Sequence, residues 1–190
     1  MIERLGLSPA ATPMENEAAL WLVLVLPLLL GVLGAIARPS RAWPVAVAGL
    51  LPLLALGWLS SQVAGTTGKS GVVELGDLVL YWRVNGLTLL LLLLTYLIGL
   101  ASALYAPAYL REDVQALARG QAWFWPLLGL LISSLALIWL AADLLSLYIG
   151  LELMGLTAVG LMLLPGKVEA LVAGLRYLLL ALVGSLAFLL

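Results

Sequence analysis

The sequence contains no cysteine and no histidine among its 190 residues. Without thiolates or imidazoles, the chain has no ligands for a cysteine-held iron–sulfur cluster, for a histidine-held haem or for a histidine-based zinc site. We therefore expect no cofactor and no metal in this chain, and neither a redox nor a hydrolytic site of its own. The sequence leaves open whether the chain is a subunit of a larger enzyme, such as a proton-translocating oxidoreductase.

Charged residues are also scarce, at 10% of the chain with a formal net charge of −1. Binding to nucleic acid requires clustered Lys and Arg, so the sequence predicts no nucleic-acid partner. In contrast, 64% of the residues are hydrophobic and the mean hydropathy is +1.17, far above the values of a soluble domain. The composition therefore predicts an integral membrane protein whose surroundings are the lipid bilayer.

Six apolar stretches each have about the 20 residues that a helix needs to cross the hydrocarbon core of a bilayer. They are residues 18–37, 43–64, 85–106, 121–142, 144–164 and 170–190. Runs such as residues 87–94 are apolar on every side, which does not fit the alternating strands of a membrane barrel. The sequence thus predicts an all-α fold, a polytopic transmembrane helix bundle of about six helices over residues 18–190. Residues 1–17 are expected to form a flexible, acidic tail.

The longest segment between predicted spans covers residues 65–83. Its second part, residues 72–82, alternates polar and apolar side chains, which predicts a short hairpin on the surface.

The basic residues are unevenly distributed between the two sides of the predicted bundle. One side holds Arg4, Lys69 and Arg83, and the other holds Arg38, Arg41, Arg111, Arg119 and Lys167. Because basic loops tend to stay in the cytoplasm, this distribution predicts an N-terminus on the outside of a prokaryotic inner membrane.

Glu152 lies near the middle of the predicted span 144–164. An ionised side chain at that depth costs at least about 2.5–3.5 kcal/mol, and such residues commonly mark ion or proton paths. The next span contains a second charge, Arg176. If the two helices form an antiparallel pair hinged at Pro165, the two side chains differ in depth by only about 3 Å, since each residue rises by about 1.5 Å. Contact between them, directly or through water, is therefore expected to depend on helix rotation.

Three interpretations of these charges stay open. Glu152 can exchange a proton, its proton affinity tuned by Arg176 or by another cation, since a nearby positive charge favours the ionised carboxylate and desolvation disfavours it. The two residues can instead form a neutralising pair that sets helix register. Arg176 can also extend its side chain to the membrane interface. Asp143, Tyr148 and Lys167 are accessory candidates, although solvated anchoring at a helix end is the ordinary role of Asp143 and Lys167.

Three segments resemble a known family. They are residues 84–109, which begin Val-Asn-Gly-Leu-Thr, residues 143–152, Asp-Leu-Leu-Ser-Leu-Tyr-Ile-Gly-Leu-Glu, and residues 169–178, which contain Gly-Leu-Arg-Tyr-Leu. In these segments the sequence is similar to the antiporter-like membrane subunits of respiratory complex I, of Mrp sodium/proton antiporters and of membrane-bound hydrogenases. The resemblance covers roughly residues 20–190 and only the amino-terminal portion of a family member.

The resemblance implies roles for two residues. Glu152 would be the fifth-helix glutamate of the proton-transfer path. Arg176 stands where the family usually has Lys, a departure that keeps the positive charge but hardly ever releases a proton. The resemblance also implies partners, namely other membrane subunits of a larger complex, with protons or monovalent cations as the transported species.

The predicted function is that of a membrane subunit of a proton- or cation-translocating complex, either complex I-like or an Mrp-type module. One alternative is a structural or assembly subunit in which Glu152 and Arg176 only set register. Another is a membrane subunit that couples proton flow to the uptake of inorganic carbon or another solute.

Overall fold

The computed structural model describes residues 13–36, 51–63, 69–75, 78–109, 117–164, 166 and 168–189. Within these residues the chain forms α1 (Pro13–Ile36), α3 (Leu51–Val63), α4 (Gly86–Tyr109), α5 (Leu117–Leu140), α6 (Leu144–Leu163) and α7 (Val168–Leu189). Two strands, β1 (Lys69–Leu75) and β2 (Leu78–Val84), pair antiparallel between α3 and α4, with Val72 opposite Tyr81. The mostly helical fold is confirmed, and so is the expected hairpin, although its strands extend beyond the predicted residues 72–82 at both ends.

Among the described residues, three helical segments are long and apolar enough to cross a membrane. They are Gly86–Ala106, Trp123–Leu140 and Leu144–Leu163, which fall in the third, fourth and fifth predicted spans. α1 contains a shorter apolar segment, Leu20–Gly34. The total of about six membrane helices stays a prediction, because parts of the predicted spans, including residues 37–50, lie outside the described residues.

The helix α1 begins at Pro13, inside the stretch that was expected to form the acidic tail. Residues 1–12 of that stretch lie outside the described residues.

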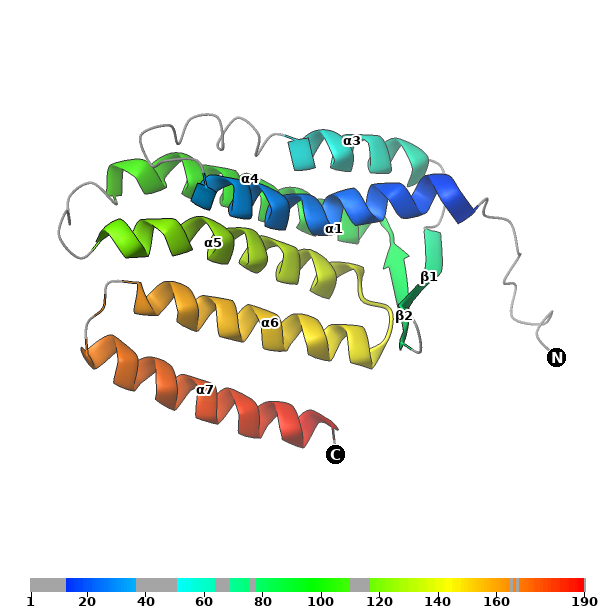
Figure 1. Ribbon diagram of the computed structural model, residues 1–190. Coiled ribbons are helices and arrows are strands. Elements are labelled where there is room, and N and C mark those ends of the chain that lie inside the picture. Colours follow the sequence, from blue (N-terminus) through cyan, green and yellow to red (C-terminus); the bar gives the residue numbers. More distant parts are fainter. Residues whose placement is uncertain are drawn as a thin grey trace.

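Helix α5 is the centre of the bundle, because it contacts α1, α4 and α6. Helix α3 packs on α1 and α4, and α7 packs on α6. Figure 1 shows the helix axes running side by side, with α7 at one edge and the hairpin at one end of the bundle. The hairpin lies where α5 ends and α6 begins (Figure 1). The start of α1, the hairpin and the α5–α6 junction therefore share one end of the bundle (Figure 1).

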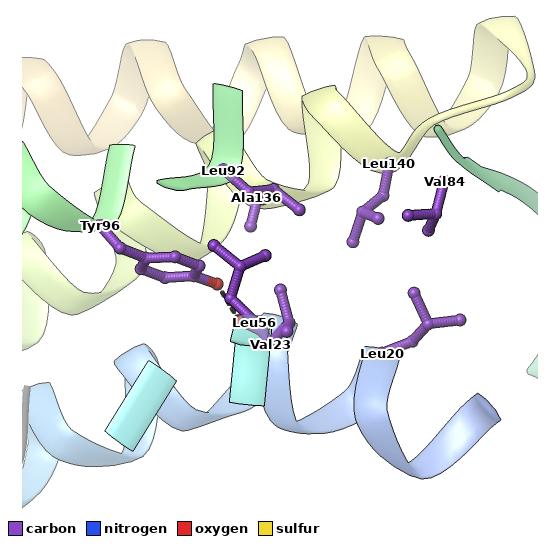
Figure 2. Close-up of a cluster of buried hydrophobic side chains, with 8 residues drawn as sticks. All are labelled: Leu20, Val23, Leu56, Val84, Leu92, Tyr96, Ala136 and Leu140. Carbon is purple, nitrogen blue, oxygen red and sulfur yellow. Dashed lines mark hydrogen bonds between the residues drawn. The ribbon is translucent and has the colours of Figure 1, made fainter. Parts of the chain in front are cut away.

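Among the described residues, the largest buried cluster joins four helices and the hairpin, as Figure 2 shows. Its members are Leu20, Val23, Leu56, Val84, Leu92, Tyr96, Ala136 and Leu140. Helices in lipid gain little from the hydrophobic effect when they associate, so close van der Waals packing has to hold this cluster together.

Two glycines let the backbones of α1 and α5 touch. A Cβ atom added at Gly129 would lie 2.4 Å from the carbonyl oxygen of Pro27, and one added at Gly31 would lie 2.5 Å from the carbonyl oxygen of Trp125. Both distances are far shorter than a van der Waals contact. Small residues at a helix crossing are the usual means of close approach in membranes, and here they bring α1 against the central helix.

Candidate functional site

Glu152 lines a cavity between α6 and α7. The cavity has a volume of about 480 Å³. Most of its lining is apolar, and its hydrogen-bonding side chains are the carboxyl group of Glu152 and the phenols of Tyr148 and Tyr177. Tyr148 precedes Glu152 by about one helical turn and so shares its face of α6, whereas Tyr177 comes from α7. We call this space the α6–α7 cavity.

The helical period of α6 explains why Glu152 faces away from α5. Ser146, Gly150 and Thr157 recur at helical spacing and are buried. A Cβ added at Gly150 would lie 2.7 Å from Cγ1 of Ile138, so this face of α6 sits directly on α5. Glu152 is two residues beyond Gly150, about 200° around the helix, and therefore points to the opposite side, where α7 packs.

The carboxyl group of Glu152 is free to form hydrogen bonds with molecules inside the α6–α7 cavity. The residue is half-buried and stands at the ninth of the 20 positions of α6. No hydrogen bond or ion pair occupies its carboxyl group within the part of the chain that the structure describes. A carboxyl group in this position can accept a proton from water in the cavity and return it.

Arg176 does not contact Glu152. The Arg176 side chain is exposed, and no ion pair joins these two described residues. The packing of α7 on α6 shows why: a Cβ added at Gly174 would lie 3.1 Å from Cγ1 of Val159, so these two positions face each other. In an antiparallel pair, Glu152 then faces Ala181, which also lines the cavity. Arg176 lies about five residues, or about 7.5 Å, nearer the α6–α7 turn.

The depth match expected from a hinge at Pro165 is therefore wrong. Helix α6 ends at Leu163 and α7 begins at Val168, so the midpoint of the turn lies between positions 165 and 166 and adds little to the offset. Gly166 sits in this turn with a φ of +69°, a left-handed conformation that favours glycine, and its N–H donates to the carbonyl oxygen of Leu163 at 3.0 Å. The packing of Gly174 against Val159 sets the offset of α7 along α6 and separates the two charges.

The accessory candidates have separate locations. Tyr148 lies in the α6–α7 cavity with Glu152, whereas Asp143 lies at the start of α6 and does not line the cavity. Lys167 lies outside the described residues. Tyr177 was not predicted as a site residue, although it belongs to the Arg-Tyr pair in the resembling segment. Its only sequence signal was a polar group inside an apolar run, and its place in the cavity follows from the α6–α7 register.

Asp143 joins the hairpin to the start of α6. Its Oδ1 accepts a hydrogen bond from the backbone N–H of Ser146 at 2.7 Å, which caps the first turn of α6. Its Oδ2 accepts from the hydroxyl of Ser146 at 2.6 Å and from the backbone N–H of Tyr81 at 2.8 Å. The backbone N–H of Ala142 donates to the carbonyl oxygen of Tyr81 at 2.9 Å. The hairpin therefore fixes where the helix that carries Glu152 begins.

These bonds also set the charge state of Asp143. Partial desolvation raises the pKa of its carboxyl group, but the hydrogen bonds from Ser146 and from the Tyr81 backbone favour the ionised form. The bonds outweigh the desolvation, and the pKa of Asp143 lies below its ordinary value. Asp143 is thus an ionised structural cap.

Comparison with solved structures identifies a protein of similar fold. A chain of the membrane-bound sulfane sulfur reductase, an archaeal respiratory membrane complex, superimposes with a TM-score of 0.73 over 90% of this chain, at 19% sequence identity. The match covers 26% of that chain, so the present chain spans about a quarter of its length. At this identity the likeness establishes a shared fold. No protein-family model matches the sequence, and no curated protein matches it.

Proposed function

We propose that this chain is a membrane subunit of a proton- or cation-translocating complex, and that Glu152 transfers protons through the α6–α7 cavity. The observation that carries the proposal is the position of Glu152: it lies near the middle of an apolar helix and lines a cavity of about 480 Å³ without a bonding partner among the described residues. A carboxyl group that served only to set register would be paired, because an unpaired charge in a membrane is costly.

Two further observations support the proposal. The fold is shared with a chain of an archaeal respiratory membrane complex. In addition, the residues 143–152 and 169–178 are similar to antiporter-like subunits of complex I and Mrp type. Both likenesses suggest that the chain works beside other membrane subunits.

In the proposed transfer step, a proton reaches the carboxyl group of Glu152 from water in the cavity and leaves to water on the other side of the same group. The phenol groups of Tyr148 and Tyr177 line the path and hold water by hydrogen bonds. Arg176 acts on Glu152 through its electric field and not through a contact, because it lies nearer the α6–α7 turn.

The test is Glu152→Gln in the complete assembly, with proton translocation measured in vesicles. The amide keeps the size of the side chain but does not bind and release a proton, so we expect translocation to fall at least about tenfold while the subunit still assembles.

The matched control is Glu169→Gln, which makes the same chemical change at an exposed position in the first turn of α7. This control is expected to translocate like the wild type. Undiminished translocation by the Glu152→Gln variant would overturn the proposal.

A further inference from the structure

Helix α7 lies at the edge of the bundle and packs on α6 (Figure 1). Gly174 marks the packed side of α7, since a Cβ added there would lie 3.1 Å from Cγ1 of Val159. The opposite side carries exposed residues that recur at helical spacing, three or four positions apart. They are Val172, Arg176, Leu179 and Val183. We call this surface the outer face of α7.

Arg176 points away from the rest of the bundle. It is two residues beyond Gly174, about 200° around the helix, and therefore projects from the side opposite to α6. It does not line the α6–α7 cavity, and no ion pair occupies its guanidinium group within the described residues. The one carboxyl group of α7 belongs to Glu169, which lies about 10.5 Å nearer the start of the helix.

The depth of Arg176 makes an unpaired charge costly. It is the ninth of the 22 residues of α7, about 12 Å along the axis from Val168, and lies inside the predicted span 170–190. Ionised side chains in membrane spans almost always face the interior of a bundle, a water-filled cavity or an opposite charge. The described residues give Arg176 none of these. Its guanidinium group therefore calls for a partner that the described residues do not supply.

The charge of Arg176 indicates what kind of partner fits the outer face. Two copies of this chain in one membrane share an orientation, so a symmetric contact through this face would bring two Arg176 side chains to the same depth, where like charges repel. Acyl chains of lipids offer no acceptor. A carboxylate fits best, because a guanidinium group donates two parallel hydrogen bonds to its two oxygens. The apolar side chains on either side of Arg176 supply the close packing that joins helices in lipid.

We propose that the outer face of α7 docks a membrane helix of another subunit, and that an Asp or Glu side chain on that helix pairs with Arg176. Apolar side chains of the same helix pack against Val172, Leu179 and Val183. The proposal rests on the proposed role of this chain as a subunit of a larger membrane complex, but not on proton transfer by Glu152. Its test measures the association of helices and not translocation, so the two proposals can fail separately.

The test measures binding of the full chain to synthetic membrane helices in phosphatidylcholine vesicles. One leucine–alanine helix carries a single Glu at its midpoint, and a second helix carries Gln there. Because the chain has no cysteine, a dye can be attached at Val168→Cys alone, a 74% exposed position at the start of α7. Energy transfer to a dye on the peptide reports binding. We expect the Glu helix to bind at least about tenfold more tightly than the Gln helix, the lower limit set by one hydrogen bond between charged groups.

Arg176→Met removes the charge at an exposed position and should abolish the preference for the Glu helix, whereas Arg176→Lys should retain most of it. The matched control is Arg83→Met, which makes the same change at an exposed position of β2 and should keep the wild-type preference.

Equal binding of the two helices by the wild type would overturn the proposal and would indicate that Arg176 extends to the membrane interface. A preference that persists in Arg176→Met would overturn it as well. The measurement is repeated in vesicles that contain anionic phosphatidylglycerol. Loss of the wild-type preference there would also contradict the proposal, because a lipid head group would then be the partner of Arg176.

Discussion

The hydroxyl of Tyr96 on α4 donates a hydrogen bond to the backbone carbonyl oxygen of Val23 on α1, as Figure 2 shows. Val23 is four residues before Pro27, which lies inside α1. Because proline has no backbone N–H, the carbonyl of Val23 lacks its helical donor. Tyr96 supplies that donor from another helix. In a membrane no water is present to donate to this carbonyl in place of Tyr96. The bond therefore provides the hydrogen bond that the Val23 carbonyl lacks, and it also holds α1 against α4.

Replacing Tyr96 by Phe should therefore destabilise the fold. The carbonyl of Val23 would be left buried without a donor, at a cost of about 1–3 kcal/mol in the free energy of unfolding. The measurement is reversible unfolding in mixed micelles. The same replacement in a Pro27→Ala background should cost less, because an alanine at this position would return the helical N–H to the carbonyl of Val23. Equal costs in the two backgrounds would show that Tyr96 stabilises the fold by another route.

Gly129→Ala should separate α1 from α5. The new Cβ would meet the carbonyl oxygen of Pro27 at 2.4 Å, and because that atom belongs to the backbone the helices themselves must move. We expect a loss of at least about 1–3 kcal/mol in unfolding free energy. Gly57→Ala is the matched control, because a Cβ there has nothing within 4 Å, and it should be neutral or slightly stabilising. Similar losses in the two variants would argue against the backbone contact.

Asp143→Asn should weaken the junction between the hairpin and α6 by about 1–2 kcal/mol, because a donor amide replaces one of the two acceptor oxygens. The change should also alter the pH dependence of stability. Since folding lowers the pKa of Asp143, its contribution is complete above the unfolded value of about 3.9 and is lost as the pH falls through the folded value. When the free energy of unfolding is measured from about pH 6 to about pH 3, it should fall less steeply with decreasing pH in the variant than in the wild type. An unchanged acid profile would count against the ionised cap.

Replacing Arg176 by Met tests the separation of the two membrane charges. Without contact between Glu152 and Arg176, the stability effects of Glu152→Gln and Arg176→Met should add to within about 0.5 kcal/mol in a double-mutant cycle. Translocation by the double variant should be as low as that of Glu152→Gln alone. A coupling energy above about 1 kcal/mol would instead indicate a register-setting pair, and normal translocation by the double variant would favour the structural or assembly role.

The sequence predicted the helices and strands better than it predicted the contacts between them. The apolar runs that overlap α4, α5 and α6 are long enough to identify these helices, because an unbroken apolar stretch has few alternatives to a membrane helix. Alternation over residues 72–82 predicted the strand pair. The apolar patterning of residues around Gly31 and Gly129, in contrast, gave no sign that these two positions would meet, because contact depends on how two helices cross.

The same division holds for the candidate site. The sequence alone determined that Glu152 is a carboxyl group near the middle of an apolar helix, since depth follows from position along a span of known rise. Only the tertiary structure decided what surrounds it. The packing of Gly174 on α7 against Val159 on α6 sets the register of the helix pair, which places Tyr177 and Ala181 in the cavity with Glu152 while Arg176 lies nearer the turn. A shift of a few residues along one helix gives each of its side chains different neighbours on the other helix. That shift is fixed by side-chain packing between the two helices, and it cannot be obtained from the sequence of one helix alone.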